Sequence, residues 1–269
     1  MPVDVPARIV AHEALNADHR LLTLEAPGIA RAAKPGQFVM LQVHAGRDPL
    51  LRRPMSICRV PGAGRRRIEV LYKIVGEGTR LLARQRQGAT LPVLGPLGNG
   101  FRLQPEVRRG AAPRVVMVAG GIGIAIFPFL ADALRRRGVR PLLLFGARGA
   151  ADLVYTAPFR GRGIPIQCAT EDGSRGARGY VTTILAPLLE ADGPKPLLYV
   201  CGPTPMLRAV GDMAVRAGAP CQMALESQMP CGIGVCLGCV VACAGNRSGP
   251  AYRRVCTEGP VFMAGEVRP

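Results

Sequence analysis

The sequence has no tryptophan, and its aromatic rings are limited to seven phenylalanines and five tyrosines. Proteins that hold single-stranded nucleic acid usually supply a platform of such rings for base stacking. The formal net charge of +17 would otherwise point to nucleic acid. However, only three of the 35 basic residues are lysines, and the arginines are spread along the whole chain. We therefore favour a solvated basic surface over an acidic protein partner, and either of these over nucleic acid.

Signals for export and for membrane insertion are also missing. The first ten residues, MPVDVPARIV, contain no basic segment followed by an apolar one, so we expect a cytoplasmic protein. Residues 115–131 carry no charge, but three glycines and Pro128 interrupt them. Such a stretch is more typical of a buried strand, a glycine turn and the start of a helix than of a membrane span.

The length of 269 residues favours two domains and a small appendage. Short apolar or alternating runs at residues 38–43, 55–59 and 68–75 are separated by glycine and proline turns, which is typical of an antiparallel barrel. We assign this barrel to residues 1–108. A basic, proline-flanked stretch at 105–113 is a candidate linker.

The pattern changes after residue 113, because continuous apolar runs begin to alternate with helical ones. This alternation predicts a parallel, doubly wound sheet over residues 109–225. The expected strands are 115–119, 141–145, 164–169 and 196–201, and the expected helices are 127–137, 181–189 and 205–217. Residues 226–269 are rich in cysteine and glycine and have no helical period, so we expect a small cluster-binding tail.

Nine cysteines in a chain without an export signal indicate metal or redox chemistry rather than disulfides. Cys231, Cys236 and Cys239 have the spacing C-x4-C-x2-C, and Cys256 follows at a distance. This is the plant-type pattern for a 2Fe-2S cluster. Three glycines, at 232, 234 and 238, suit a loop whose backbone N–H groups turn toward the sulfurs. Zinc is the rival metal, and Cys243 is a spare thiol that we expect to be a small buried side chain.

Two segments of the predicted barrel have features of a flavin site. Arg53, in the motif RRPMS, can hold a pyrophosphate, and Ser56 can reach the flavin ring, although an ordinary basic turn has the same composition. In the segment YKIVGEGT, Tyr72 or the stem of Lys73 can stack on a ring. Gly78 and Thr79 in the same segment open a helix whose free N–H groups favour phosphate.

Two loops of the predicted sheet are candidates for nicotinamide binding. The loop AGGIG, with Gly120, Gly121 and Gly123, follows a buried strand and precedes a helix, but it is not the usual dinucleotide fingerprint. The segment CGPTPM begins at Cys201 and lies at the strand end where such sheets bind ligands. An ordinary strand-to-helix turn with Pro205 as the first helical residue is the alternative.

Taken in order, these motifs resemble the ferredoxin-reductase superfamily over nearly the whole chain. Within it they are most similar to the electron-transfer subunits of NAD-dependent, class 1B dihydroorotate dehydrogenases. The matching segments are RRPMSI, YKIVGEGT, AGGIG, TEDGSRGARGYVT, YVCGPTPM, CGIGVCLGC and YRRVCTEGPVF. The resemblance implies FAD contacts at Arg53, Pro54, Met55, Ser56, Leu71, Tyr72, Lys73, Gly78 and Thr79. It implies NAD contacts at Gly120, Gly121, Gly123, Cys201, Gly202, Pro203 and Met206.

The same resemblance implies a partner, a catalytic subunit with its own FMN, in an assembly with two copies of each subunit. Electrons would pass from dihydroorotate through FMN, the 2Fe-2S cluster and FAD to NAD, in pyrimidine biosynthesis. The chain offers no general base for dihydroorotate, so the substrate chemistry belongs to that partner. Candidate catalytic residues are Ser56, Cys201, which is otherwise a buried strand-end thiol, and Glu226, which is otherwise a surface carboxylate.

Two alternatives remain open at this stage. Related chains serve sulfide dehydrogenase and NADH-dependent ferredoxin:NADP oxidoreductase, but many of those have Asp in place of the first cluster cysteine, so Cys231 favours the dihydroorotate interpretation. A zinc-stabilised nucleic-acid-binding protein is the alternative from a different class. One departure from the family is Ile126, where a proline is usual, and this change can alter nicotinamide access. The preference between NADH and NADPH is left open.

Overall fold

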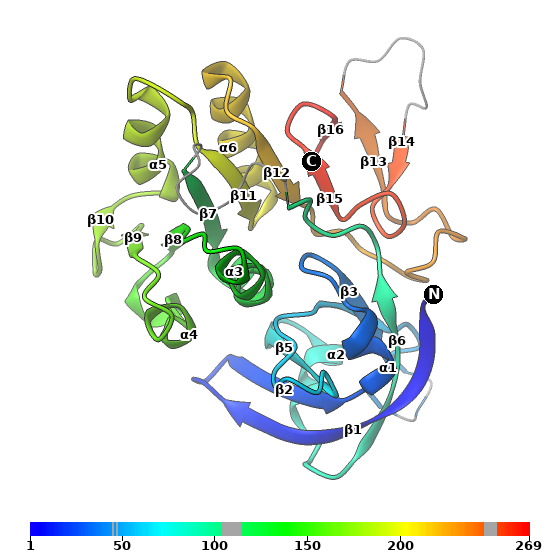
Figure 1. The fold of residues 1–269 in the computed structure, drawn as a ribbon. Coiled ribbons are helices and arrows are strands. Elements are labelled where there is room, and N and C mark those ends of the chain that lie inside the picture. Colours follow the sequence, from blue (N-terminus) through cyan, green and yellow to red (C-terminus); the bar gives the residue numbers. More distant parts are fainter. Residues whose placement is uncertain (45, 47, 104–113, 245–251) are drawn as a thin grey trace.

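The computed structural model describes residues 1–44, 46, 48–103, 114–244 and 252–269. It has an antiparallel barrel, a parallel sheet covered by helices, and a C-terminal tail that lies beside both (Figure 1). The predicted linker at 105–113 and the predicted boundary at residue 108 fall outside the described residues. The division into 1–108, 109–225 and 226–269 therefore stays a prediction.

The barrel is a six-stranded antiparallel sheet with the order β4-β3-β6-β1-β2-β5. Its strands are β1 (Val3–Ala14), β2 (His19–Glu25), β3 (Phe38–Leu41), β4 (Arg53–Ser56), β5 (Arg67–Lys73) and β6 (Thr90–Leu97), and its helices are α1 (Pro27–Ala32) and α2 (Glu77–Ala83). The two edge strands meet where the Cys58 N–H donates to the Glu69 carbonyl at 2.8 Å and the Glu69 N–H donates to the Arg59 carbonyl at 2.9 Å. The run predicted at 55–59 is thus split, because β4 ends at Ser56 and the next residues close the barrel.

The second part is a seven-stranded sheet with the order β10-β9-β8-β7-β11-β12-β15. Its parallel strands are β7 (Val115–Gly120), β8 (Leu142–Ala147), β9 (Ile166–Thr170), β10 (Ala177–Arg178), β11 (Leu197–Cys201) and β12 (Cys221–Ala224). The intervening helices are η1 (Gly121–Ile126), α3 (Phe127–Arg136), η2 (Ala150–Asp152), α4 (Ala157–Arg160), α5 (Val181–Glu190) and α6 (Thr204–Ala217). The expected doubly wound fold is confirmed. Because α6 begins at Thr204, Pro205 is its second residue and not its first.

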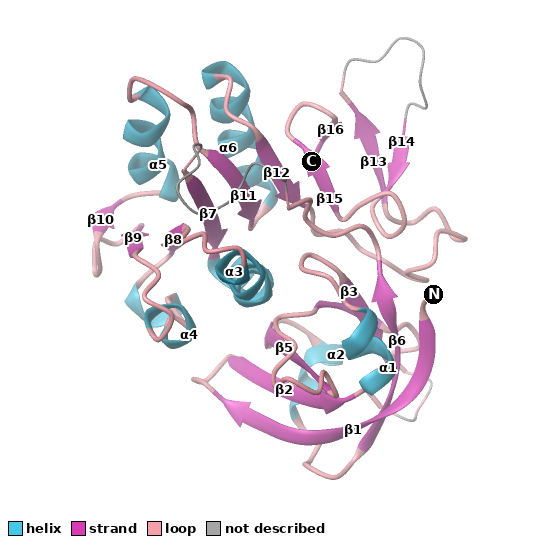
Figure 2. Ribbon diagram, viewed as in Figure 1, coloured by secondary structure: helices cyan, strands magenta, loops and turns pink. Residues whose placement is uncertain are grey.

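Helices cover both faces of this sheet (Figure 2). Apolar residues of α5 and α6 pack on one face, and those of α3 and α4 pack on the other. Helix α3 lies between the sheet and the barrel (Figure 1). Its Phe129 side chain is 3% exposed and belongs to the barrel core. The start of α3 therefore packs against the barrel, which holds the predicted flavin segments.

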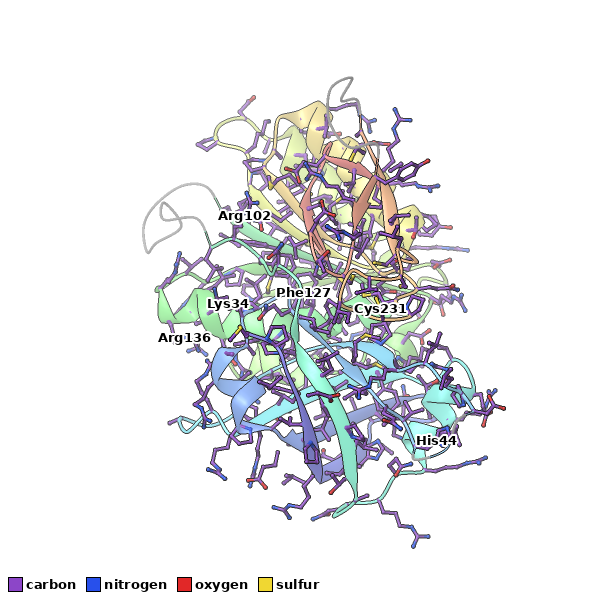
Figure 3. All side chains as sticks on the ribbon, turned by 90° about the vertical axis from the view of Figure 1, so that its right-hand side faces the viewer. Lys34, His44, Arg102, Phe127, Arg136 and Cys231 are labelled. Carbon is purple, nitrogen blue, oxygen red and sulfur yellow. The ribbon has the colours of Figure 1, made fainter. Side chains whose placement is uncertain are left out.

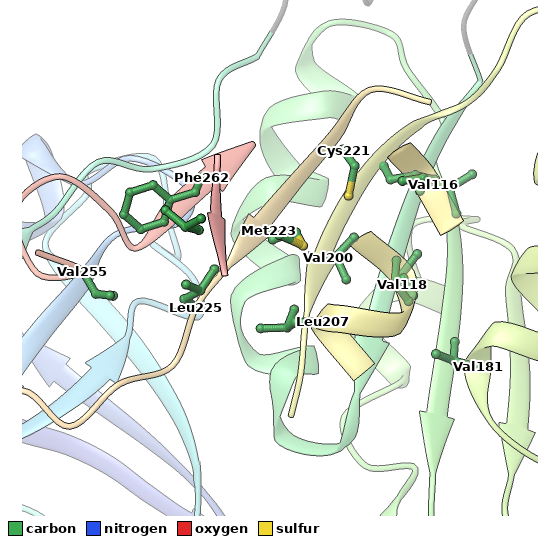
Figure 4. Close-up of a cluster of buried hydrophobic side chains, with 14 of the residues drawn as sticks. Val116, Val118, Val181, Val200, Leu207, Cys221, Met223, Leu225, Val255 and Phe262 are labelled. Carbon is green, nitrogen blue, oxygen red and sulfur yellow. The ribbon is translucent and has the colours of Figure 1, made fainter. Parts of the chain in front are cut away.

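The tail contains no helix among its described residues, as the sequence predicts. Strands β13 (Val240–Cys243), β14 (Tyr252–Arg254) and β16 (Val267–Arg268) form a small antiparallel sheet. In contrast, β15 (Val261–Met263) leaves that sheet and pairs antiparallel with β12. The sequence does not predict this exchange, which gives the tail and the parallel sheet one continuous core (Figure 4).

Among the described residues, no helix combines the length and the apolar character that crossing a membrane requires.

Candidate flavin, nicotinamide and iron-sulfur site

The flavin segment is strand β4, and its two faces look toward different parts of the molecule. In its ladder with β3, Ser56 lies opposite Phe38 and Pro54 lies opposite Met40. Opposed residues of an antiparallel pair share one face. Phe38 and Met40 belong to the apolar cluster that also contains the tail, whereas Met55 packs into the barrel core. Ser56 therefore shares the face that meets the tail.

The second predicted flavin segment lies directly against the first. The Arg53 guanidinium packs over Gly78 so closely that a Cβ at residue 78 would overlap it. The Thr79 hydroxyl oxygen accepts hydrogen bonds from the N–H groups of Val75 at 2.9 Å and Gly76 at 3.1 Å. Thr79 thus holds the turn that opens α2, and Gly78 makes room for the cation. Fragments that are 25 residues apart in the sequence, 53 and 78, form one cationic corner of the barrel.

Of the two side chains that the sequence offers for stacking on a flavin ring, Tyr72 points into the barrel, which leaves the Lys73 stem for that role. The Tyr72 side chain is 2% exposed in the barrel core, where the hydroxyl is hydrogen-bonded to His12 Nε2 at 2.8 Å. Burial raises the pKa of this phenol. Strand alternation places Leu71 and Lys73 on the other face, and Lys73 Nζ forms an ion pair with Asp152 Oδ1 of the sheet domain at 3.0 Å. Leu71 and the Lys73 stem remain the candidate contacts of this strand.

The two candidate nicotinamide loops meet at the carboxyl edge of the parallel sheet. Strands β7 and β11 are neighbours, and the strand order reverses between them, which is where such sheets bind dinucleotides. A Cβ on Gly123 would come within 2.6 Å of the Cys201 carbonyl carbon, and one on Gly202 would come within 3.1 Å of the Gly120 Cα. Gly121 has a φ of +50° and open space around it. Only glycines permit this packing of backbone against backbone.

Cys201 and Glu226 are brought together near this edge. Cys201 is 4% exposed, and its register partner on β12 is Ala224, two residues before Glu226. Burial raises the pKa of the Cys201 thiol, and the Glu226 carboxylate raises it further. Glu226 reaches solvent, yet the protein around its carboxyl group removes enough water to raise its pKa as well. Both proposed catalytic roles stay predictions, but the two groups are neighbours.

The four cysteines of the predicted ligand set lie in the tail as two pairs of neighbours, Cys231 with Cys236 and Cys239 with Cys256. Burial opposes ionisation of Cys231, but hydrogen bonds from the N–H groups of Cys236 and Ile233, the Cys236 thiol and the Val235 N–H lower its pKa to about 6. Cys256 is paired with Cys239, and burial together with this neighbour raises the pKa of Cys256 to about 12. The thiols therefore form two adjacent pairs, one for each iron of a binuclear cluster.

The loop between these thiols has the backbone that such a cluster needs. Gly232, Gly234 and Leu237 have φ values of +73°, +83° and +56°. Left-handed residues of this kind allow neighbouring backbone N–H groups to point to one side and bind an anion. Gly238 has no positive φ, but its N–H donates to Cys236 Sγ at 3.4 Å, as the sequence predicts for this loop. A Cβ at this position would also come within 3.0 Å of Pro230. The positive φ of Leu237 could not be predicted from the sequence, because a non-glycine residue gives no signal of this conformation.

Within the described part of the chain, no three thiol, imidazole or carboxylate groups gather closely enough to hold a single metal ion. Paired thiols that are spread over a longer site fit two irons better than one zinc. One buried polar atom supports the same fit, since the Thr257 hydroxyl beside the loop has no hydrogen-bond partner among the described residues. The spare thiol Cys243 is half-buried in β13, not fully buried as expected.

The cluster loop rests on the barrel. A Cβ on Gly232 would come within 2.6 Å of Met40 Cγ on β3 and within 3.4 Å of Leu97 Cδ1 on β6. Asn99 Nδ2 also donates to the carbonyls of Thr257 at 3.0 Å and Glu258 at 3.2 Å. Figure 3 labels Cys231 where the tail meets the barrel. The cluster loop thus lies against the strand that neighbours the flavin segment.

Comparison with known proteins gives the class of this fold. The solved structure of an NADH-dependent reduced ferredoxin-NADP oxidoreductase superposes with a TM-score of 0.83 at 27% identity, over 98% of this chain and 90% of that chain. A ferredoxin NADP+ reductase from Neisseria gonorrhoeae with bound FAD and NADP superposes with a TM-score of 0.66 at 18% identity, over 80% of this chain and 92% of that one. The fold and site define a ferredoxin-reductase-type protein with an iron-sulfur tail.

Sequence comparison is more specific. The model of the iron-sulfur cluster binding domain of dihydroorotate dehydrogenase B matches residues 226–268. The electron transfer subunit of dihydroorotate dehydrogenase B (NAD(+)) from Bacillus caldolyticus is 41% identical over 252 residues, 91% of each chain. The subunit of the same name from Shouchella clausii is 39% identical over 265 residues, 96% of each chain. This chain belongs to the family of dihydroorotate dehydrogenase B electron transfer subunits.

Proposed function

We propose that this protein carries electrons between a dihydroorotate dehydrogenase catalytic subunit and NAD(H), through a 2Fe-2S cluster and FAD, as a step of pyrimidine biosynthesis in the cytoplasm. The partner holds FMN, and the assembly contains two copies of each subunit. Full-length similarity to subunits of that name supports the proposal.

One observation carries the proposal most directly, namely the contact of the cluster loop with the barrel. Gly232 packs on Met40, and Met40 lies opposite Pro54 of the flavin segment in the β3–β4 ladder. A residue with a side chain at position 232 would push the loop away from the barrel. The chain therefore holds its cluster beside its flavin segment, as a relay of single electrons requires.

In this proposal some of the site residues bind FAD or the dinucleotide, and others lie beside the reacting atoms. When bound, FAD exchanges a hydride with the nicotinamide and single electrons with the cluster. In this proposal Arg53, which packs over Gly78, binds the pyrophosphate, and Ser56 contacts the flavin ring. Gly120, Gly121, Gly123 and Gly202 leave the backbone open for the dinucleotide, with Pro203 and Met206 beside them. Cys201 and Glu226 flank the reacting end, where burial raises the pKa of the Glu226 carboxyl group and so makes it a better proton acceptor than an ordinary carboxylate.

The surface around the cluster loop suits a protein partner. Cys236 is exposed, and four apolar side chains near it are also exposed: Ile233 at 49%, Val235 at 76%, Leu237 at 59% and Val240 at 43%. Soluble proteins seldom leave such a group of apolar residues uncovered unless a partner covers it. We infer that the catalytic subunit covers this apolar rim, which we define as Ile233, Val235, Leu237 and Val240.

Reconstitution tests the function. The chain is purified anaerobically, its visible spectrum is recorded for flavin and cluster bands, and it is mixed with the catalytic subunit, dihydroorotate and NAD. We expect NADH to form only when both subunits are present. If sulfide or reduced ferredoxin with the corresponding partner reduced the flavin, and dihydroorotate with its catalytic subunit did not, one of the related reductase complexes would replace this assignment. A colourless preparation that binds zinc would exclude both the dihydroorotate dehydrogenase assignment and the related reductase complexes.

A further inference from the structure

We propose that the Thr257 hydroxyl donates a hydrogen bond to a sulfur of the iron-sulfur cluster and thereby sets its reduction potential. The inference rests on the proposed function only in assuming that the four thiols hold the cluster. It assigns a role to a residue that is neither a ligand nor part of the cysteine spacing.

The first observation is an unpaired polar atom. Thr257 follows the ligand Cys256, and its Oγ1 has essentially no solvent-accessible surface and no hydrogen-bond partner among the described residues. Buried hydroxyls in folded proteins nearly always have a partner. The missing acceptor is therefore something that the described protein atoms around Thr257 do not supply.

The second observation is where the hydroxyl lies. A Cβ built on Gly234 would come within 2.8 Å of Thr257 Cγ2 and 3.3 Å of its Oγ1. Gly234 belongs to the cluster loop, and its N–H points to the Cys256 thiol. Thr257 is thus packed between a ligand and the loop that encloses the cluster, where sulfur is the acceptor that the site provides.

The third observation is that the position of Thr257 is fixed from outside the loop. Its carbonyl accepts a hydrogen bond from Asn99 Nδ2 at 3.0 Å, and the Asn99 N–H donates to the Gly259 carbonyl at 2.6 Å. The barrel therefore holds the segment after Cys256 in place. A donor that is held in this way stabilises the more negative, reduced cluster, because it draws electron density from the sulfur.

The test compares Thr257→Val, which keeps the shape of the side chain, with Thr257→Ser, which keeps the hydroxyl. Iron content is measured first, and the cluster potential is then found by redox titration followed by EPR. We expect a shift to lower potential in Thr257→Val and a value near that of the wild type in Thr257→Ser. Pulsed EPR after exchange into D2O should detect, besides the loop N–H protons, one further exchangeable proton close to the cluster in the wild type and in Thr257→Ser. This further proton should be missing in Thr257→Val.

The outcomes separate this inference from the proposed function. An unchanged potential in Thr257→Val at full iron content would overturn the hydrogen bond and leave the electron relay intact. If Thr257→Val lost its iron, retention of iron and potential by Thr257→Ser would support the hydroxyl. Loss of iron in both variants would show that Thr257 acts only by packing on Gly234. Wild-type protein without a cluster would overturn the function itself.

Discussion

The four candidate ligand thiols differ in how far they lie from solvent. Cys239 and Cys256 are 2% and 1% exposed, Cys231 is half-buried and Cys236 is exposed. The Cys231–Cys236 pair is thus nearer to the surface that a partner would cover, and the Cys239–Cys256 pair is nearer to the interior. One side of the proposed cluster would therefore face the surface that a partner covers, and the other side would face the interior of this protein.

Removing one thiol tests the ligand set. We expect Cys236→Ser to lose most of its iron and the visible absorption of the cluster, because serine is a poor ligand for these irons. Flavin absorption should remain, since Cys236 is an exposed residue of the tail and lies outside the predicted flavin segments. Cys243→Ser is the matched control, a nearby thiol outside the spacing, and its iron content should equal that of the wild type. Full iron in Cys236→Ser would refute the ligand assignment.

His19 predicts a pH dependence of stability. Burial, followed by the Lys73 cation, lowers the pKa of this imidazole from 6.5, so the fold favours its neutral form. The unfolded chain binds the proton more readily, and stability is therefore lost as the pH falls through 6.5 toward the folded-state pKa. Thermal unfolding between about pH 7.5 and about pH 5.5 should show a larger fall in Tm for the wild type than for His19→Gln. Equal falls would contradict the assignment.

At the scale of elements, helix α3 links the nucleotide loop to the barrel. Its Phe129 N–H donates to the Cys58 carbonyl at 2.9 Å, and Asp132 bridges Arg59 at 3.3 Å and Arg162 at 2.6 Å. Cys58 and Arg59 follow the flavin segment directly, whereas α3 follows the AGGIG loop. The candidate flavin segment and the candidate nicotinamide loop are therefore connected through one hydrogen bond and the ion pairs of Asp132, which hold them at a set distance from each other.

Neutralising Asp132 tests this connection. We expect Asp132→Asn to slow the reduction of FAD by NADH by roughly tenfold, because small displacements of reacting groups are costly. Stopped-flow absorbance measures the rate, and the FAD content should not change. Glu25→Gln is the matched control, since Glu25 also bridges two arginines, Arg8 and Arg66, at the barrel surface. If both variants reduced FAD at the wild-type rate, Asp132 would have no positioning role.

Elements are also the level at which sequence patterns work well. The runs expected at 181–189 and 196–201 correspond to α5 (Val181–Glu190) and β11 (Leu197–Cys201), because apolar period and burial agree. The orientation of Tyr72 could not be predicted, since Leu71, Tyr72 and Lys73 are all compatible with either face. The bridging role of Asp132 depends on arginines 73 and 30 residues away, and single-sequence spacing carries no such information.

At the scale of the whole molecule, the apolar rim predicts where assembly occurs. We expect Val235→Asp to weaken binding to the catalytic subunit by about tenfold or more, since a charge would enter a desolvated interface. Sedimentation or calorimetry with the purified partner measures the affinity. Val215→Asp on α6 is the matched control, because Val215 is 57% exposed and lies outside the rim. Undiminished binding by Val235→Asp with intact cofactors would place the interface elsewhere.

The exchange of β15 into the parallel sheet has a consequence for modularity. Ala224 and Met223 of β12 pair with Val261 and Phe262, so strand β15 of the tail covers the open edge of the parallel sheet. Cutting the chain before the tail would expose a row of unpaired backbone groups, which invites aggregation. The iron-sulfur segment is therefore not a removable accessory. Grafting it onto another reductase would also require a host whose outermost strand accepts it.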